Sequence, residues 1–252
     1  MRYFMDISFR GAPYHGWQVQ PGDVSVQGTL EAALTTLMRR EVAVTGAGRT
    51  DAGVNARRMV AHVDLDIAPA DTPRLIRSLN AIVRPDIVVN SMMEVADDAH
   101  ARFDAVARTY RYFCHTAQNP FVYPLSWQTP PKLDFSAMNE AARHILGTRD
   151  FTSFAKLHSD ARTNICTVTH ARWHRLPDEP TRLYFEITAD RFLRNMVRAV
   201  VGTLVMVGTG RITPDGVHDI IDARDRCAAG TSMPANALFL WDVHYSYYNP
   251  LT

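Results

Sequence analysis

A glycine-rich loop at residues 46–54, with the sequence GAGRTDAGV, has the most distinctive combination of side chains in the chain. Its three glycines allow the backbone to approach a ligand closely, and Arg49 and Asp51 lie between them. The spacing matches neither a P-loop nor a dinucleotide fingerprint, and a carboxylate at this place would repel phosphate. Asp51 is therefore interpreted either as a nucleophile or base, or as part of a structural turn.

A second segment, residues 100–112 (HARFDAVARTYRY), combines basic and aromatic residues. On a strand predicted at 109–116, Tyr110 and Tyr112 share one face and Arg111 points to the other. Interleaved aromatic and arginine side chains are typical of proteins that hold unpaired bases. Two core tyrosines on an amphipathic strand would give the same pattern.

A helix predicted at 190–207 places three arginines on one face, because Arg191, Arg194 and Arg198 are spaced i, i+3, i+7. For Arg191 and Arg194, a solvated basic face and a contact with nucleic acid explain the pattern equally well. Arg198 is flanked by apolar residues, so we expect its guanidinium to be buried and to need a carboxylate partner.

Composition sets the protein class. The chain has 252 residues and a net charge of +1, with 46% hydrophobic and 21% charged residues, which excludes disorder or a fibrous repeat as its main character. Of 27 basic residues only Lys132 and Lys156 are lysines. Arginine suits phosphates and bases, although codon usage in a GC-rich genome would also give this count. No apolar run spans a membrane and no signal-peptide core is present, so we expect a cytoplasmic protein.

Cysteine and histidine spacing gives no indication of a metal centre. The three cysteines, Cys114, Cys166 and Cys227, form neither a zinc ribbon nor a disulfide framework. The histidines lack the H-E-x-x-H spacing, and no cofactor motif is present. We therefore expect no metal and no cofactor.

Hydrophobic periodicity predicts an α+β fold in two halves. In the first half the predicted strands are 3–9, 42–44, 59–67 and 86–95, and the predicted helices are 26–40, capped by Ser25, and 72–82. In the second half the predicted strands are 109–116, 168–173, 182–188 and 238–245, and the helices are 135–146, 190–207 and 214–223. Each half should place helices on one face of a mainly antiparallel sheet, which predicts domains at 1–104 and 105–252.

Seven segments of the chain resemble the tRNA pseudouridine synthase A family. They occur along the chain in the same order as in the family, and the resemblance extends from about residue 3 to 245. They are GRTDAGV at 48–54, YHGWQ at 14–18, SVQ at 25–27, HARF at 100–103, YRY at 110–112, DFTSF at 150–154 and FLRNMVRAVVG at 192–202. Two positions depart from the family pattern. Asn55 stands where histidine usually follows Gly-Val, and Ala99 stands where an aromatic residue usually precedes HARF. These departures concern local tRNA contacts and not the reaction.

The resemblance implies the pseudouridine synthase fold, built from two halves derived from the ferredoxin-like fold. It also implies conversion of uridine to pseudouridine at positions 38, 39 and 40 of the tRNA anticodon stem-loop. A homodimer that one tRNA bridges, and no cofactor, are implied as well. Asp51 would be the catalytic carboxylate, which could add to C6, attack C1′, or assist elimination of a ribose proton; the sequence leaves these routes open.

The resemblance also implies roles for other residues. Arg198 matches the arginine that keeps the carboxylate ionised, and Arg49 matches the residue that fills the space of the flipped base. Tyr110 matches the tyrosine against the flipped uracil, where it stacks or removes the C5 proton. Contacts to phosphate are predicted for His100, Arg102, Arg191 and Arg194.

Two alternatives from other classes stay open on the residues alone. One is a non-catalytic RNA-binding module with ferredoxin-like halves. The other is a phosphohydrolase that uses Asp6, Asp51 and Asp64 with a divalent metal, which retained activity in a chelator would exclude.

Overall fold

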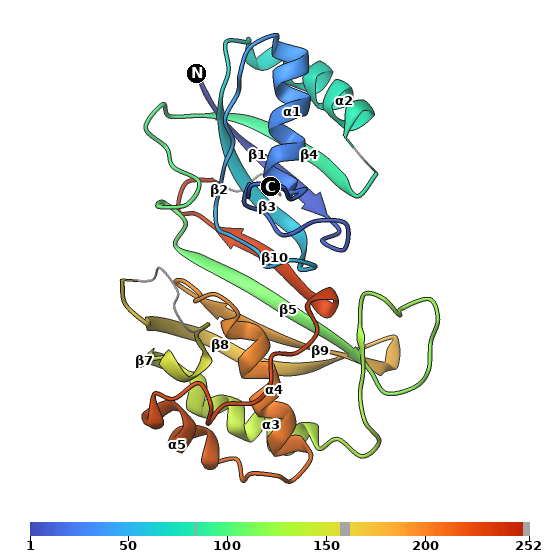
Figure 1. Cartoon of the computed structure of the whole chain (residues 1–252), viewed down its shortest axis with the longest axis vertical. Helices are drawn as coiled ribbons and strands as arrows, with labels where there is room; N and C mark the ends of the chain where they lie inside the picture. The colour runs from blue at the N-terminus through green and yellow to red at the C-terminus, as the bar shows by residue number, and fades with distance from the viewer. Residues whose placement is uncertain (84, 157–161, 249–252) are drawn as a thin grey trace. The chain divides into compact units, whose positions relative to one another are not determined.

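The structure is a computed structural model that describes residues 1–83, 85–156 and 162–248. The chain divides into two packing units (Figure 1). The first contains residues 1–106 and the segment that begins at residue 240, and the second contains Ala107–Phe239. The chain therefore returns to its first unit after completing the second. The predicted domains, 1–104 and 105–252, stay a prediction.

The sheet of the first unit has the strand order β4-β1-β3-β10. These strands are β1 (Arg2–Phe9), β3 (Asn55–Asp64), β4 (Ile87–Val95) and β10 (Leu238–His244). Strand β1 pairs antiparallel with both β3 and β4, and the short strand β2 (Thr45–Gly46) pairs antiparallel with β3. Helices α1 (Val26–Met38) and α2 (Thr72–Ile82) lie side by side over this sheet, and a 3-10 turn, η1 (Pro69–Asp71), precedes α2 (Figure 1).

Local signals predicted the helices of this unit well. The Gly28 N–H donates to Ser25 Oγ at 3.1 Å, which confirms Ser25 as the cap of α1. Helix α2 covers the predicted residues 72–82. The strand predicted at 42–44 is wrong. The N–H groups of Val42 and Val44 donate to the side chains of Thr35 and Glu31 on α1, so they are not used in a sheet.

Strand β3 begins at Asn55 rather than 59, and both of its faces are buried rather than one. The second face is covered in part by the C-terminal segment, because the guanidinium carbon of Arg58 on β3 lies 5.7 Å from the centre of the Tyr248 ring. The ring of Phe4, on the neighbouring strand β1, lies 5.3 Å from the ring of Tyr245 and 5.0 Å from that of Tyr248. Because this cover comes from nearly 200 residues further along the sequence, alternation within β3 did not predict it.

The sheet of the second unit has the order β5-β9-β8-β7, and all these neighbours pair antiparallel. The strands are β5 (Ala107–His115), β7 (Gly147–Asp150), β8 (Ile165–Leu176) and β9 (Glu179–Ala189), and β6 (Trp127–Gln128) pairs parallel with β5. The helices are α3 (Phe135–Ala142), α4 (Met196–Gly208) and α5 (Gly216–Ala223), with 3-10 turns η2 (Arg143–Ile145), η3 (Thr152–Phe154) and η4 (Ala235–Ala237). The two units together confirm an α+β fold with mainly antiparallel strands and flanking helices.

Helix α4 begins at Met196, so the helix predicted at 190–207 is wrong over its first six residues. The Asp190 carboxylate explains the difference, because its Oδ1 accepts the N–H groups of Thr167 at 2.8 Å and Arg191 at 2.7 Å. Asn195 then adopts a left-handed conformation with φ 68°. Arg191 and Arg194 therefore precede α4, and the predicted arginine face with Arg198 does not exist.

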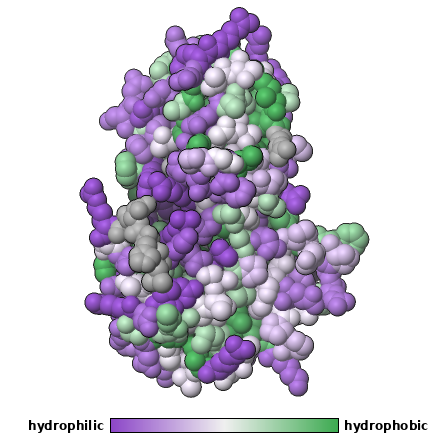
Figure 2. All heavy atoms as spheres, in the orientation of Figure 1, coloured by the Kyte–Doolittle hydropathy of each residue, from purple (hydrophilic) through white to green (hydrophobic). Residues whose placement is uncertain are grey.

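No helix among the described residues is both long enough and apolar enough to cross a membrane. The longest helices, α1 and α4, have 13 residues each, whereas a span needs about 20. Hydrophilic residues cover much of the face shown in Figure 2, and hydrophobic residues form small scattered groups there.

Candidate active site

The glycine-rich loop connects β2 to β3 in the first unit. Its backbone turns sharply after Asp51, because the Val54 N–H donates to the Asp51 carbonyl at 3.1 Å and Gly53 has a φ of 78°. Asp51 is half-buried and Arg49 is exposed. The loop thus carries a half-buried carboxylate two residues after an exposed guanidinium.

A preceding segment, residues 11–17, holds this loop in place. The Trp17 N–H donates to the Thr50 carbonyl at 3.2 Å. Gly16 has a φ of 97°, and a Cβ at this position would lie 2.4 Å from the same carbonyl oxygen. A Cβ on Gly11 would lie 2.1 Å from the Val54 carbonyl oxygen. The backbone before and after Asp51 is therefore fixed by contacts that only glycine permits.

Asn55 completes this contact. Its side chain is buried, and its Oδ1 accepts the Gly11 N–H at 2.9 Å. Ala99, the other departure from the family pattern, is also buried, and its carbonyl accepts a hydrogen bond from Arg2 at 3.0 Å. Both departures are thus packing positions in this chain.

We expect Gly16→Ala to reduce any activity that depends on the Asp51 carboxylate by about 100-fold, because a displaced loop moves this side chain. Gly22→Ala is the matched control, since Gly22 also has a positive φ, of 82°, but no atom lies within 4 Å of its added Cβ. Both variants carry a similar backbone strain of about 1 kcal/mol. Single-turnover rates and thermal melts of both variants would check this. Equal rates for the two variants would contradict a positioning role of Gly16.

His100 and Arg102, also in the first unit, lie in a tight turn. His100 Nδ1 accepts the N–H groups of Arg102 at 3.1 Å and Phe103 at 3.3 Å, so this nitrogen is engaged within the turn. The His100 ring also packs on His62, at 4.7 Å, and burial lowers the pKa of His62 to about 4. Arg102 is exposed. For both residues a contact to phosphate stays a prediction.

Tyr110 lies on β5 in the second unit and is half-buried. Its ring packs edge-on against Phe192, with ring centres 5.0 Å apart. The neighbouring Tyr112 is fully buried, and burial raises the pKa of its phenol well above the usual range. Its hydroxyl has no hydrogen-bond partner among the residues that the structure describes.

Arg198 lies in the first turns of α4 and is half-buried, so full burial of its guanidinium is not observed. Its Nε donates to the Met233 carbonyl at 2.5 Å, which fixes the guanidinium near the 230–233 segment. The positive charge of Arg198 also opposes the rise in the pKa of Tyr112. Arg191 is half-buried and Arg194 exposed, both on the connection from β9 to α4.

The predicted site residues are divided between the two units. Arg49 and Asp51 share one loop, and His100 and Arg102 share one turn, all in the first unit. Tyr110, Arg191, Arg194 and Arg198 belong to the second unit.

Sequence reasoning missed the positioning residues Gly11, Gly16, Trp17 and Asn55, and it missed Phe192 as the neighbour of Tyr110. The family resemblance marked Gly16 and Trp17 within YHGWQ, Phe192 within FLRNMVRAVVG and Asn55 as a departure, but it did not say what these residues contact. Gly11 had no sequence signal.

The chain is similar in sequence to known proteins over most of its length. A family model described as tRNA pseudouridine synthase matches residues 141–246. The chain is 52% identical over 244 residues to tRNA pseudouridine synthase A of Bacteroides thetaiotaomicron, covering 97% of this chain and 90% of that protein. It is 40% identical over 251 residues to tRNA pseudouridine synthase A of Bacillus subtilis (strain 168), covering 97% and 99%.

Among solved structures, the chain is similar to one chain of a crystal structure of a Cbf5-Nop10-Gar1 complex. The TM-score is 0.35 at 10% identity, and the match covers 81% of this chain and 54% of that chain. This similarity is too distant to support a conclusion about this chain.

Proposed function

Because the chain belongs to the tRNA pseudouridine synthase A family, and is therefore a tRNA-modifying isomerase, we propose that it converts uridine to pseudouridine at positions 38, 39 and 40 of the anticodon stem-loop. We propose Asp51 as the catalytic carboxylate. The observation that carries this assignment is its half-buried position on a loop whose backbone is fixed on both sides of it. A rigid loop suits a group that must meet a reacting atom within a few tenths of an ångström.

The reaction balances without a redox step or a group donor. The N1–C1′ bond breaks, the base turns, C5 bonds to C1′, and the proton on C5 leaves while N1 takes up a proton. Asp51 can serve by adding to C6, by attacking C1′, or by assisting loss of a ribose proton. All three routes need the ionised carboxylate.

Arg198 is proposed to keep Asp51 ionised. A guanidinium beside a carboxylate lowers the pKa of the carboxyl group by about 1–3 units. The hydrogen bond from Nε to the Met233 carbonyl supports this role, because it sets the direction of the guanidinium independently of any carboxylate.

Base flipping is assigned to Arg49 and Tyr110. Arg49 is exposed and lies two residues before Asp51, where it can fill the space that the uridine leaves. Tyr110 is proposed to stack on the flipped uracil, and the edge-on contact with Phe192 holds its ring in one orientation. Removal of the C5 proton is a second role that this position leaves open to Tyr110.

The two alternatives from other classes lose support. The phosphohydrolase needs Asp6, Asp51 and Asp64 around a metal, but Asp6 binds Arg58 and Asp64 binds Arg2. Among the described residues these three carboxylates form no metal-ligand group. Membership in a family of isomerases argues against both this enzyme and a purely RNA-binding module.

The proposal is tested by mapping pseudouridine with mass spectrometry on several unmodified tRNA transcripts, incubated with the enzyme in a chelator. We expect conversion confined to uridines at positions 38–40. Conversion only at other positions would overturn the proposed site. No conversion on any transcript would overturn the activity.

Arg194 is expected to contact a tRNA phosphate, because it is exposed on the connection to α4. Arg194→Ala should then reduce the slope of log affinity against log salt by roughly one unit. Arg224→Ala is the control, since Arg224 is also exposed in the second unit and pairs with Asp150. Binding titrations at several salt concentrations measure the slope, and a slope equal to that of the wild type would remove Arg194 from the interface.

The homodimer bridged by one tRNA also stays part of this proposal. It rests on the family resemblance, and sedimentation of the enzyme with and without tRNA would test it. A monomer that binds tRNA one-to-one would contradict it. Location in the cytoplasm stays a prediction as well.

A further inference from the structure

The sheet of the second unit has two faces of different character. Side chains alternate along its strands, so Tyr112 and Phe185 point to the buried face, and Arg111, Tyr184 and Glu186 point to the other. Strand β8 adds His170 and His174 to this second face. The result is a polar cluster of half-buried side chains that the proposed reaction does not use.

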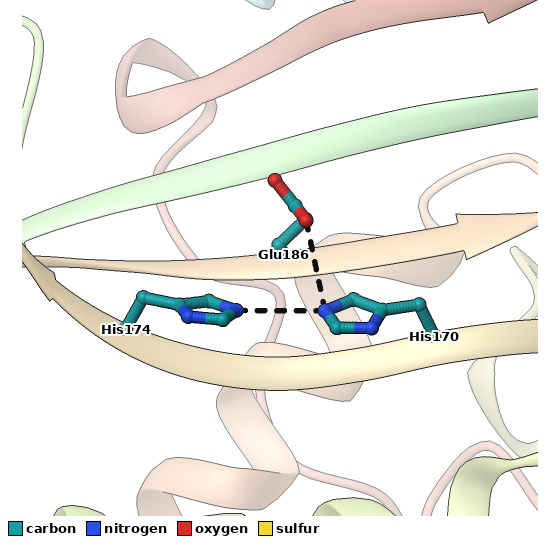
Figure 3. Close-up of side chains that lie close together, drawn as sticks. All are labelled: His170, His174 and Glu186. Carbon is teal, nitrogen blue, oxygen red and sulfur yellow. Dashed lines mark hydrogen bonds and ion pairs between the residues drawn. The ribbon is translucent and has the colours of Figure 1, made fainter.

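Register explains why the two histidines meet one carboxylate. Glu186 on β9 lies opposite Arg172 of β8, and His170 and His174 are the residues two positions before and after Arg172. Both imidazoles are therefore diagonal neighbours of Glu186 on the same face. Figure 3 shows the two rings extending toward each other along β8, with the Glu186 carboxylate above His170.

The distances among the three side chains are those of a ligand set. His170 Nε2 lies 3.5 Å from His174 Nε2 and 3.6 Å from Glu186 Oε1 (Figure 3). Ligands bound tetrahedrally to Zn²⁺ at 2.0–2.1 Å are about 3.3 Å apart. All three ligand atoms lie within 4.8 Å of one another, so small side-chain rotations would close the set.

We propose that His170, His174 and Glu186 bind one divalent transition-metal ion of the zinc class. Two imidazoles and one carboxylate are ligands that Zn²⁺ accepts, and three protein ligands leave its fourth position to water. The spacing of the histidines along the chain predicted no metal, because it matches no familiar ligand motif. Side chains four residues apart on one strand meet only when both of them bend along the strand toward each other. The third ligand, Glu186, lies on a different strand.

Neighbouring groups already orient these ligands. The Arg111 Nε donates to Glu186 Oε2 at 2.6 Å, which leaves Oε1 facing His170. The ring of His174 stacks on Tyr184 at 5.1 Å. Such supporting contacts are typical of metal sites.

Charge sets the expected strength of the site. One carboxylate leaves bound Zn²⁺ with a net positive charge, and the guanidinium of Arg111 lies beside it, with the exposed Arg172 opposite Glu186 in register. We therefore expect binding near micromolar affinity, weaker than that of structural zinc sites. Arg111 and Tyr110 point to opposite faces of the sheet, so the ion would lie on the face away from Tyr110 and would not be needed for the isomerisation.

Tag-free enzyme dialysed against Zn²⁺, with bound metal measured by mass spectrometry, tests the site. We expect one zinc per chain for the wild type and at least a 100-fold weaker affinity for His170→Ala/His174→Ala. The matched control is His144→Ala/His218→Ala, which removes two other imidazoles of the same unit whose rings lie 6.1 Å apart and face carboxylates. Its zinc affinity should equal that of the wild type.

A second readout separates loss of the site from loss of the fold. Zinc should raise the melting temperature of the wild type and of the control variant but not that of His170→Ala/His174→Ala, while pseudouridine formation in a chelator should be equal for all three. Equal zinc binding by the two double variants would overturn the proposal. So would a wild type that binds no zinc at about 100 μM, roughly 100 times the expected dissociation constant, in which case the two imidazoles share only a hydrogen bond.

Discussion

Asp51→Asn is expected to lower the rate of pseudouridine formation by about four orders of magnitude or more while tRNA affinity stays within a few-fold of the wild type. The amide has nearly the shape of the carboxylate but lacks its charge and nucleophilicity, so every proposed route stops. Losses of this size are typical when a central catalytic group is removed. Binding should survive because contacts to the phosphate backbone supply most of the affinity.

The structure predicts that this variant folds normally. Backbone groups hold the loop, through the hydrogen bond of Trp17 to the Thr50 carbonyl and the close approach of Gly16. Asp66→Asn is the matched control, since Asp66 is an exposed aspartate of the same unit. Single-turnover rates and filter-binding affinities would be measured for both variants. If Asp51→Asn lost affinity and rate together, Asp51 would act in binding or loop structure instead.

Arg58→Met is expected to lower the free energy of unfolding by about 3–5 kcal/mol, the usual cost of leaving buried charges without their partner. The Arg58 side chain is only 8% exposed. Its Nε donates to Asp6 at 2.9 Å, and its Nη1 donates to Asp242 at 2.6 Å and to the Val243 carbonyl at 3.2 Å. Methionine keeps the apolar stem but leaves the buried Asp6 and the half-buried Asp242 without the guanidinium that both of them bind.

An exposed pair provides the comparison. Arg182 binds Glu179 at 2.6 Å, but these side chains are 26% and 48% exposed. Arg182→Met should therefore cost less than about 1 kcal/mol, as surface ion pairs do. Urea unfolding of both variants measures the difference. A loss below 1 kcal/mol for Arg58→Met would show that water reaches the carboxylates and that the cluster is not a buried one.

The sequence predicted elements whose signals are local. Ser25 caps α1, and Thr72 with Pro73 begins α2, because capping and proline preferences act within one turn. The start of α4 depended on a partner elsewhere, since Asp190 binds the Thr167 backbone, and no helix periodicity reports such a contact. The buried second face of β3 likewise depends on Tyr245 and Tyr248.

The candidate site divides in the same way. The types and spacing of Arg49 and Asp51, between glycines, marked the loop before any fold was known. The loop's support was not predictable, because it comes from Gly11 and Gly16, which lie more than 30 residues earlier. The ligand set of His170, His174 and Glu186 also required the register between two strands.

Strand β10 has a consequence for biosynthesis. Ribosomes release a chain from its N-terminus, and domains usually complete their folding in that order. Here the first unit lacks Asp242, Tyr245 and Tyr248 until after the second unit has emerged, so until then Arg58 would have Asp6 as its carboxylate partner without Asp242. The second unit, Ala107–Phe239, emerges complete before then. The unit that carries Asp51 therefore completes its packing after the second unit, once Asp242, Tyr245 and Tyr248 have left the ribosome.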